Sequence, residues 1–105
     1  MLVKPQLKLS LGASLDATNI KEESDVYLEC KIHANPWVFD VTWLFEDEIL
    51  LSHVEAGIIV SNQSLVLQKI KRQNNGRYKC KATNKVGSSI SNEVYFQIKC
   101  TWLEM

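Results

Sequence analysis

The most regular stretch of the chain is residues 77–83, where apolar and polar side chains alternate strictly. Successive side chains of an extended strand point to opposite faces, so this alternation indicates a β-strand with one buried and one solvated face. Asn75-Gly76 before the stretch and Val86-Gly87 after it favour turns, because Asn and Gly tolerate the positive φ of tight turns. The buried positions are Tyr78, Cys80 and Ala82, and the solvated positions are Arg77, Lys79, Lys81 and Thr83.

The rest of the chain repeats this pattern in short segments. Residues 26–33 alternate over eight positions, with Val26, Leu28, Cys30 and Ile32 on the buried face. Turn-forming and charged residues separate the segments, and apolar residues do not recur at helical spacing for long. About seven to nine short strands therefore predict an all-β sandwich. The other predicted strands are residues 7–11, 41–45, 49–51, 58–60, 65–70 and 88–99.

Length and charge restrict the possible classes of function. With 105 residues and 46% hydrophobic content, the chain is long enough for one compact domain. Its 12 basic and 12 acidic residues cancel, so no net field favours nucleic acid or an anionic membrane. No apolar run approaches the roughly 20 residues of a membrane helix. Lys4, Pro5 and Lys8 interrupt the first 11 residues, which excludes the apolar core of a secretory leader there.

The spacing of Cys, Trp and Tyr is that of an immunoglobulin sandwich. Trp43 follows Cys30 by 13 residues, and Tyr78 precedes Cys80 by two. With several other positions, these residues resemble the I-set immunoglobulin family over nearly the whole chain. The resemblance implies an immunoglobulin-like Greek-key β-sandwich of two antiparallel sheets at residues 6–99, followed by a tail outside the family pattern at residues 100–105. The residues that carry it are Cys30, Trp43, Leu67, Gly76, Tyr78, Cys80, Ala82, Asn84 and Gly87.

The I-set resemblance also implies roles for the core residues. Cys30 and Cys80 would form a disulfide between the two sheets, with Trp43 packed beside it and Leu67 in the same core. Tyr78 resembles the tyrosine corner, whose hydroxyl donates to the backbone of the preceding turn. The alternative is two buried free thiols, as in an I-set domain of an intracellular filament protein.

Asn74 departs from the family pattern. The family usually has Asp six residues before its second cysteine, paired with a basic residue across the end of the sandwich. The neutral amide of Asn74 accepts hydrogen bonds but forms no ion pair. We therefore expect it to hold the turn without the family's salt bridge.

A longer resemblance is to an internal immunoglobulin domain of the arthropod Sidestep family. Those proteins are cell-surface receptors, similar in style to nephrin-type adhesion molecules, that act in axon guidance and bind Beaten-path-type immunoglobulin proteins. The resemblance implies a cell-adhesion and recognition module whose partners are other immunoglobulin-superfamily proteins or neighbouring domains of the same chain. Its stretches are LSLG at 9–12, IKE at 20–22, DVYLEC at 25–30, ANP at 34–36, AGIIVSNQSLVLQ at 56–68 and SNEVY at 91–95.

Cysteine usage bears on the compartment. A stable disulfide belongs in an oxidising compartment, which favours an extracellular domain, yet the chain starts without a secretory leader. We expect it to be part of a longer secreted or membrane-anchored protein. An intracellular filament domain and a stand-alone secreted immunoglobulin protein are the alternatives.

Asn62-Gln63-Ser64 is a sequon for N-linked glycosylation, and it lies in a predicted turn from which a sugar would project. Such tripeptides are also frequent by chance. An extracellular chain would carry a glycan at Asn62, whereas a chain made in the cytosol would leave Asn62 unmodified.

The sequence offers no enzyme site and implies no cofactor. His33 and His53 are 20 residues apart, with no cysteine or carboxylate cluster at zinc-ligand spacing. Glu46, Asp47 and Glu48 alternate direction in a predicted hairpin turn, so they do not converge on calcium or on a substrate. We therefore expect no metal and no small-molecule substrate.

The exposed side chains then carry the function. One sheet should expose a mixed face of apolar, aromatic and paired charged residues, which suits protein contact. Trp37 and Phe39 lie together in one loop, where two large aromatics are costly to leave in water. We expect them to fold back over the end of the core, or otherwise to contact a neighbouring domain or a partner. The predicted contact face is Leu44, Glu46, Lys79, Lys81, Thr83, Tyr95 and Gln97.

The tail at residues 100–105 holds the third cysteine, Cys100, and Trp102. Cys100 has no expected partner within the domain, so an intermolecular disulfide is one interpretation. We favour the other, that the tail is an alternative or truncated end of the domain.

Overall fold

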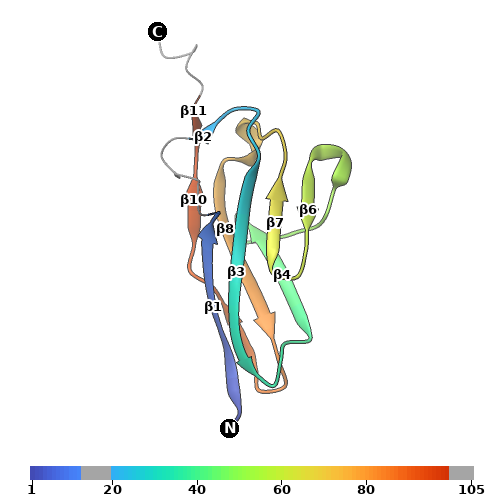
Figure 1. Cartoon of the computed structure of the whole chain (residues 1–105), viewed down its shortest axis with the longest axis vertical. Helices are drawn as coiled ribbons and strands as arrows, with labels where there is room; N and C mark the ends of the chain where they lie inside the picture. The colour runs from blue at the N-terminus through green and yellow to red at the C-terminus, as the bar shows by residue number, and fades with distance from the viewer. Residues whose placement is uncertain (13–19, 100–105) are drawn as a thin grey trace.

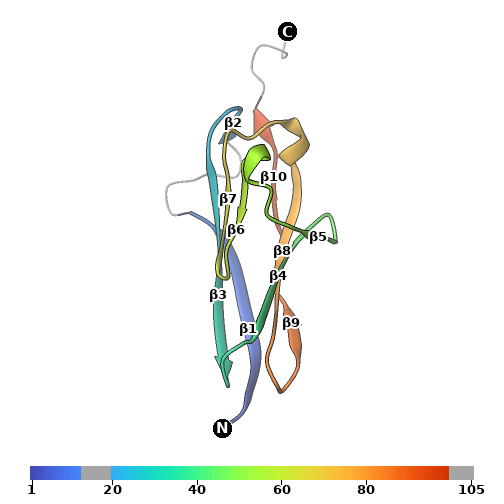
Figure 2. The same cartoon turned by 90° about the vertical axis from the view of Figure 1, so that its right-hand side faces the viewer.

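A computed structural model describes residues 1–12 and 20–99 of the chain. Two antiparallel sheets pack face to face (Figure 1), and Figure 2 shows them as two layers side by side. The first sheet has the order β1 (Val3–Leu11), β3 (Val26–Asn35), β7 (Ser64–Leu67), β6 (Ile58–Val60). The second has the order β10 (Val94–Phe96), β8 (Gly76–Thr83), β4 (Asp40–Phe45), β5 (Glu48–Leu50), with β9 (Ser88–Ile90) paired to β8. The predicted all-β Greek-key sandwich of two antiparallel sheets is confirmed.

Short elements complete the described fold. β2 (Ile20–Lys21) pairs in parallel with β11 (Ile98–Lys99) at the end of the sandwich opposite the N-terminus (Figure 1). Two 3-10 helices, η1 (Val54–Ala56) and η2 (Arg72–Asn74), each span three residues. They were not predicted, because three residues are too few for any helical periodicity to show in the sequence.

The core forms where the inward faces of the two sheets meet. Alternation along β3 and β8 places every second side chain there, as their burial patterns show. The largest side chains that are less than 2% exposed are Trp43, Tyr78, Phe96, Leu9, Leu28, Leu65, Leu67, Ile70, Val26, Cys30 and Cys80.

The two sheets are joined by the disulfide between Cys30 and Cys80. Cys30 lies in β3 and Cys80 in β8, so the bridge crosses the core. Trp43 pairs in register with Cys80, is 1% exposed and donates from its indole Nε1 to the carbonyl of Ser61 at 3.0 Å. The indole therefore fills the core beside the bridge while its one polar group is satisfied.

The connections also follow local chemistry. Glu46 and Asp47 form the two-residue hairpin loop between β4 and β5, and both have positive φ, 52° and 68°, which matches the twist of the paired strands. Just before the start of β8, the backbone carbonyl of Asn74 accepts the Tyr78 hydroxyl at 2.5 Å, as a tyrosine corner requires. The Asn74 side chain accepts the Lys71 N–H at 2.8 Å, so a hydrogen bond holds this turn.

Residues 88–99 form three short strands instead of the single strand predicted. Ser91 and Asn92 interrupt it, because their side chains bond to backbone. The Ser91 hydroxyl accepts the Cys80 N–H at 2.9 Å. The Asn92 amide exchanges two hydrogen bonds, of 2.8 and 2.9 Å, with the backbone of Leu9 in the other sheet. Asn92 thus links the edges of the two sheets by side-chain hydrogen bonds. It does so at the position where the single predicted strand would have continued its backbone hydrogen bonds.

Other strand boundaries also differ from the prediction, with the largest differences at β1, β7 and β3, which runs on to Asn35. β1 begins at Val3, and not at residue 7. β7 ends at Leu67, after which positive φ at Lys69 turns the chain so that Ile70 enters the core. β5 ends at Leu50, and the apolar Leu51 after it is exposed.

Candidate protein-contact surface

The outward side of the second sheet gathers side chains from five strands into one surface. Strand register places Leu44 of β4 between Lys79 of β8 and Ile49 of β5. It likewise places Ile90 of β9 beside Lys81. We call this surface the contact face, and it consists of Thr42, Leu44, Ile49, Arg77, Lys79, Lys81, Thr83, Ile90 and Tyr95.

Apolar and aromatic groups are spread across the contact face. Ile49 is 67% exposed at one edge of the sheet, Ile90 is 56% exposed on β9, and Tyr95 is 54% exposed on β10. Leu44 lies half-buried between them. A mixture of apolar and polar groups is typical of the surface that a non-obligate protein interface buries.

The charges on this side of the sheet are largely paired. Lys79 Nζ donates to Asp47 Oδ1 at 2.8 Å. This hydrogen bond lowers the pKa of Asp47 and raises the pKa of Lys79. Arg77 Nε lies 3.7 Å from Glu46 Oε2, which also accepts the Arg77 backbone N–H at 2.6 Å. Lys81 is exposed and forms no ion pair with the described residues, so it is the cation of the face that is free for a partner.

Of the seven residues predicted for the contact face, five lie on it. They are Leu44, Lys79, Lys81, Thr83 and Tyr95. Gln97 follows β10 and accepts the Tyr95 hydroxyl at 3.3 Å, so it extends the face at one corner. Glu46 lies in the β4–β5 turn, and its bonds to Arg77 make it a support for the turn at the edge of the face.

Sequence reasoning missed four residues of the contact face: Thr42, Ile49, Arg77 and Ile90. Ile49 belongs to the apolar run Ile49-Leu50-Leu51. Because all three residues are apolar, alternation alone did not show which of them point inward and which outward. Ile90 was placed within one continuous strand, whose break at Ser91 shifts the register of the residues before it. Arg77 was placed on the solvated side of its strand, but its proximity to Glu46 depends on the β4–β5 turn.

Trp37 and Phe39 are exposed, 55% and 73%, in the loop between β3 and β4. The expectation that they fold back over the core is therefore wrong. The Phe39 N–H donates to the Thr83 carbonyl at 3.0 Å, which anchors the loop backbone to the end of β8 and leaves both rings outside the sandwich. The same loop shares a small hollow of about 90 Å³ with the exposed Asn62 and with Gln63.

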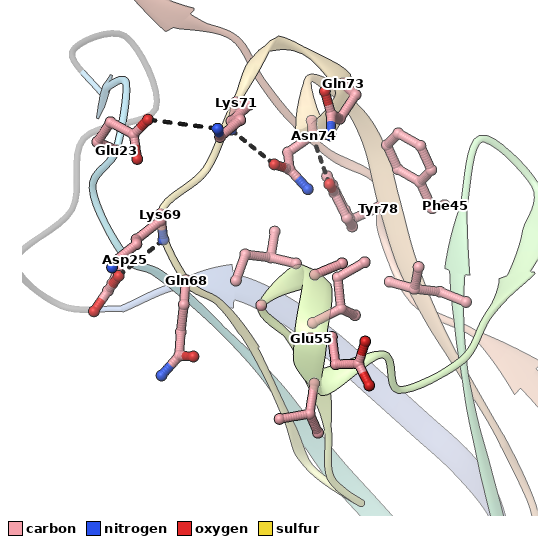
Figure 3. A pocket seen from close by; sticks show the side chains of 16 residues that line it. Glu23, Asp25, Phe45, Glu55, Gln68, Lys69, Lys71, Gln73, Asn74 and Tyr78 are labelled. Carbon is pink, nitrogen blue, oxygen red and sulfur yellow. Dashed lines mark hydrogen bonds and ion pairs between the residues drawn. The ribbon is translucent and has the colours of Figure 1, made fainter.

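A larger open hollow of about 670 Å³ lies beside η1 and η2 (Figure 3). Some of its charged residues are held by bonds within the domain, and Glu55 also lines it. Lys71 Nζ is 3.8 Å from Glu23 Oε1, and the Lys69 N–H donates to Asp25 Oδ1 at 3.1 Å. Burial, and secondarily the Glu46 carboxylate, raises the pKa of the Tyr78 hydroxyl at the hollow's wall, so this hydroxyl is a permanent donor to Asn74. The hollow thus has structural hydrogen bonds and no evident chemistry.

The histidines and acidic residues in the described part of the chain form no metal site. His33 and His53 are both exposed. Among residues 1–12 and 20–99, no three His, Cys, Asp or Glu side chains converge to hold a metal ion. Neither of the short helices found there is long and apolar enough to cross a bilayer. The predicted tail at residues 100–105, with Cys100, lies outside the described residues.

The chain matches a known family model and several curated relatives. A family model described as "Immunoglobulin I-set domain" matches residues 10–97. Human Hemicentin-1 is 29% identical over 90 residues, which are 86% of this chain and 2% of that protein. Mouse Palladin is 34% identical over 89 residues, covering 79% of this chain and 6% of Palladin. Mouse Cell adhesion molecule 1 is 27% identical over 94 residues, covering 89% of this chain and 19% of that protein. This chain thus spans a small part of each relative.

Solved structures share the fold. The extracellular domains 3–5 of Drosophila OTK superpose with a TM-score of 0.76 at 17% identity, covering 94% of this chain and 33% of that one. The ectodomain of mouse nectin-like molecule 4 superposes with a TM-score of 0.74 at 18% identity, covering 92% of this chain and 31% of that one. Most relatives are extracellular or cell-surface proteins, and some are intracellular.

Proposed function

Because this chain belongs to the immunoglobulin I-set family, we propose that it is an extracellular recognition module, one domain of a longer cell-surface receptor of the neuronal-guidance type. The module binds another protein through the contact face. The observation that carries the proposal is the mixture on that face: Ile49, Leu44 and Tyr95 supply apolar and aromatic area, and Lys81 supplies an unpaired charge.

The shape of the domain supports a place within a row of domains. The N-terminus and β11 lie at opposite ends of the sandwich (Figure 1). Domains joined before and after this one would therefore meet its two ends, and the outward sides of both sheets would stay accessible. The contact face lies along the length of the molecule and not at an end, which favours a partner approaching from the side.

The disulfide supports an extracellular location. Cytosolic reductants keep thiols reduced, whereas the secretory pathway allows the Cys30–Cys80 bridge to form and persist. The relatives of this family include Cell adhesion molecule 1, which fits a role in cell adhesion. The sequon at Asn62 lies in an exposed turn, which fits a glycoprotein.

The partner we propose is another protein of the immunoglobulin superfamily. The resemblance to the Sidestep receptors points to Beaten-path-type proteins, and neighbouring domains of the same chain are the second possibility. Nucleic acid is disfavoured by the zero net charge, since backbone phosphates demand clustered positive charge. A small-molecule substrate is disfavoured because several polar groups that line the hollow of Figure 3 are already bonded within the domain.

Binding to a panel of immunoglobulin ectodomains tests the proposal. The purified chain, multimerised to raise avidity, is measured against the panel by surface plasmon resonance. Tyr95→Ala and Lys81→Glu should each weaken the binding that is found by roughly tenfold or more. The first sheet offers matched controls in Tyr27→Ala and Lys31→Glu, since Tyr27 is 51% exposed and Lys31 is exposed. Equal loss in both pairs would refute the contact face.

An intracellular filament domain is the second candidate. The 34% identity with Palladin favours it. The two candidates differ in chemistry: a filament domain has reduced cysteines and an unmodified Asn62. Counting free thiols on the protein from its natural source, under conditions that block exchange, separates the two.

A further inference from the structure

The turn that carries the sequon is fixed to the core on both sides. The Trp43 indole donates to the Ser61 carbonyl at 3.0 Å, and the Cys30 N–H donates to the Gln63 carbonyl at 2.8 Å. A third hydrogen bond, from Ser61 N–H to Ser64 carbonyl at 2.9 Å, closes the turn. The exposed Asn62 side chain therefore projects from a rigid base.

The hollow beside this turn is apolar on one side. β7 pairs with β3 only from Val26 to Glu29, so the hairpin of β6 and β7 ends partway along β3 (Figure 2). Beyond that point Ile32, which is partly buried against the core, lines the hollow. Trp37, Phe39 and Val41 also line the hollow, together with Asn62 and Gln63 of the turn.

We propose that Asn62 carries an N-linked glycan whose first N-acetylglucosamine residues lie against Trp37 and Phe39. A pyranose ring has one face of C–H groups, which stacks favourably on the electron-rich face of an aromatic ring and removes apolar surface from water. Its hydroxyl and acetamido groups remain free to bond with the Gln63 side chain or with Asp40 at the same hollow. The inference rests on the extracellular location proposed above.

The modification itself requires a donor from the secretory pathway. The Asn62 amide nitrogen bonds to the anomeric carbon of an oligosaccharide held on a lipid pyrophosphate. The bond from that carbon to the pyrophosphate oxygen breaks, the lipid pyrophosphate leaves with its electron pair, and one amide proton passes to a base of the transferring enzyme. The chain supplies the acceptor amide and the Ser64 hydroxyl of the sequon.

A tethered sugar fits this hollow better than a free ligand does. At about 90 Å³ it is far below the roughly 300–1,000 Å³ of pockets that enclose small molecules. A sugar linked at Asn62 does not need enclosure, because its tether supplies a high local concentration. A glycan there would also stand between the two aromatic rings and any protein approaching them, which disfavours Trp37 and Phe39 as a partner site.

The test uses the chain secreted from eukaryotic cells that make high-mannose glycans. Intact mass gives the occupancy of Asn62, and melting temperatures are compared before and after two enzymatic treatments. Endoglycosidase H leaves a single N-acetylglucosamine, whereas peptide N-glycosidase F removes the whole glycan and converts Asn62 to Asp. We expect full removal to lower Tm by about 4 °C or more, and trimming to one sugar to retain most of that difference.

Variants identify the surface that the glycan touches. In the variant Trp37→Ala/Phe39→Ala, both treatments should change Tm by less than half as much as in the wild type, and the exposure of both rings means that this variant folds. Tyr27→Ala/Ile90→Ala, which removes exposed apolar groups elsewhere, should leave the wild-type shifts intact.

Three results would overturn the inference. If Asn62 is unoccupied in secreted protein, the proposed modification does not occur. If the Tm shift is the same with and without the two aromatic rings, the glycan does not stack on them. Loss of partner binding in Trp37→Ala/Phe39→Ala, with the contact-face variants still binding, assigns the rings to a partner. The first two results leave the binding measurements on Tyr95 and Lys81 unaffected, so they are distinguishable from a failure of the proposed function.

Discussion

Tyr78 packs in the core and also holds the turn that precedes β8. Its ring stacks on Phe96 with centroids 5.2 Å apart and contacts Phe45 at 4.8 Å. Its hydroxyl reaches the Asn74 carbonyl at 2.5 Å. Since burial raises the pKa of this hydroxyl, it stays protonated and keeps donating across the physiological pH range. A single side chain thus ties η2 to the start of β8.

Tyr78→Phe should lower the free energy of unfolding by about 1–2 kcal/mol, because it removes one hydrogen bond and leaves the Asn74 carbonyl without that donor. Urea unfolding followed by circular dichroism measures the change. Tyr95→Phe removes a hydroxyl from an exposed tyrosine and should change the stability by less than about 0.5 kcal/mol. Equal effects in the two variants would contradict the role given to Tyr78.

Lys79 and Asp47 make a pH-dependent pair on the surface. The Lys79 ammonium lowers the pKa of Asp47 below its ordinary 3.8, so the pair's contribution to stability is present above pH 3.8 and is lost as pH falls through the lowered pKa. Asp47 raises the pKa of Lys79 above 10.5, so at high pH the contribution is lost as pH rises through that raised value.

Lys79→Met should therefore move the pKa of Asp47 upward, toward 3.8. Carboxyl ¹³C chemical shifts followed through an acid titration measure this pKa directly. The control Lys31→Met removes an exposed lysine from the outward side of the other sheet. It should leave the pKa of Asp47 unchanged. An Asp47 pKa that does not respond to Lys79→Met would show that the pair does not persist in solution.

At the level of the elements, alternation in the sequence was sufficient for the strands that bury one face. β3 and β8 were predicted nearly in full, because their apolar side chains keep period two over eight residues. Alternation did not predict where a polar side chain takes the place of a backbone hydrogen bond between strands, as Asn92 does at Leu9. In the sequence pattern, such an Asn looks the same as a solvated Asn. Sequence reasoning failed also for Trp37 and Phe39, because an aromatic's preference for burial does not specify what covers it.

The contact face divides in the same way. Most residues whose outward direction follows from alternation along β8 or β4 were predicted, whereas Ile49 and Ile90 depend on which strand pairs with which. Pairing is a long-range property, and single-strand periodicity does not contain it.

A substitution at Gly57 tests the connection between η1 and β6. Gly57 lies between these two elements with φ +81°, and a Cβ added there would lie 2.5 Å from the Gln68 carbonyl oxygen. Gly57→Ala should lower the free energy of unfolding by about 1–3 kcal/mol, since both the backbone angle and the close contact are unfavourable for alanine. Chemical denaturation measures the loss.

Gly87→Ala is the matched control for Gly57→Ala. A Cβ at Gly87 would meet only the flexible end of Lys4, with the nearest atom, Cε, at 3.3 Å. Its stability should stay within about 0.5 kcal/mol of the wild type. If both alanine variants lose the same stability, strain at Gly57 is not the reason.

At the scale of the whole molecule, two sheets share one core, and covalent and polar links between them hold their relative positions. Asn92 joins their edges, and the Cys30–Cys80 bridge joins their centres beside Trp43. The outward sides of both sheets are left for other contacts. The Cys30–Cys80 bridge therefore bears on the stability of the domain, on the compartment in which it folds and, through the compartment, on the proposed function.

Replacing both bridged cysteines, Cys30→Ala/Cys80→Ala, should lower the free energy of unfolding by about 4 kcal/mol, because a loop closed over 50 residues no longer restricts the unfolded chain. Domains of this kind have about 5–15 kcal/mol in total, so the variant should melt far below the wild type or unfold. Differential scanning calorimetry measures the loss. The alanines also remove volume next to Trp43, so Cys30→Val/Cys80→Val, which refills it, separates the cavity from the bridge.

The chemical state of the same cysteines decides between the two proposed compartments. Of the three cysteines in the chain, the bridge leaves Cys100 as the only thiol to react when the protein is denatured without reductant. Labelling of protein from its natural source should therefore modify one thiol, and labelling after reduction should modify three. Three reactive thiols before reduction would favour the filament domain. They would also remove the entropic stabilisation on which the large calorimetric difference depends, so that Cys30→Ala/Cys80→Ala would then cost only the packing beside Trp43.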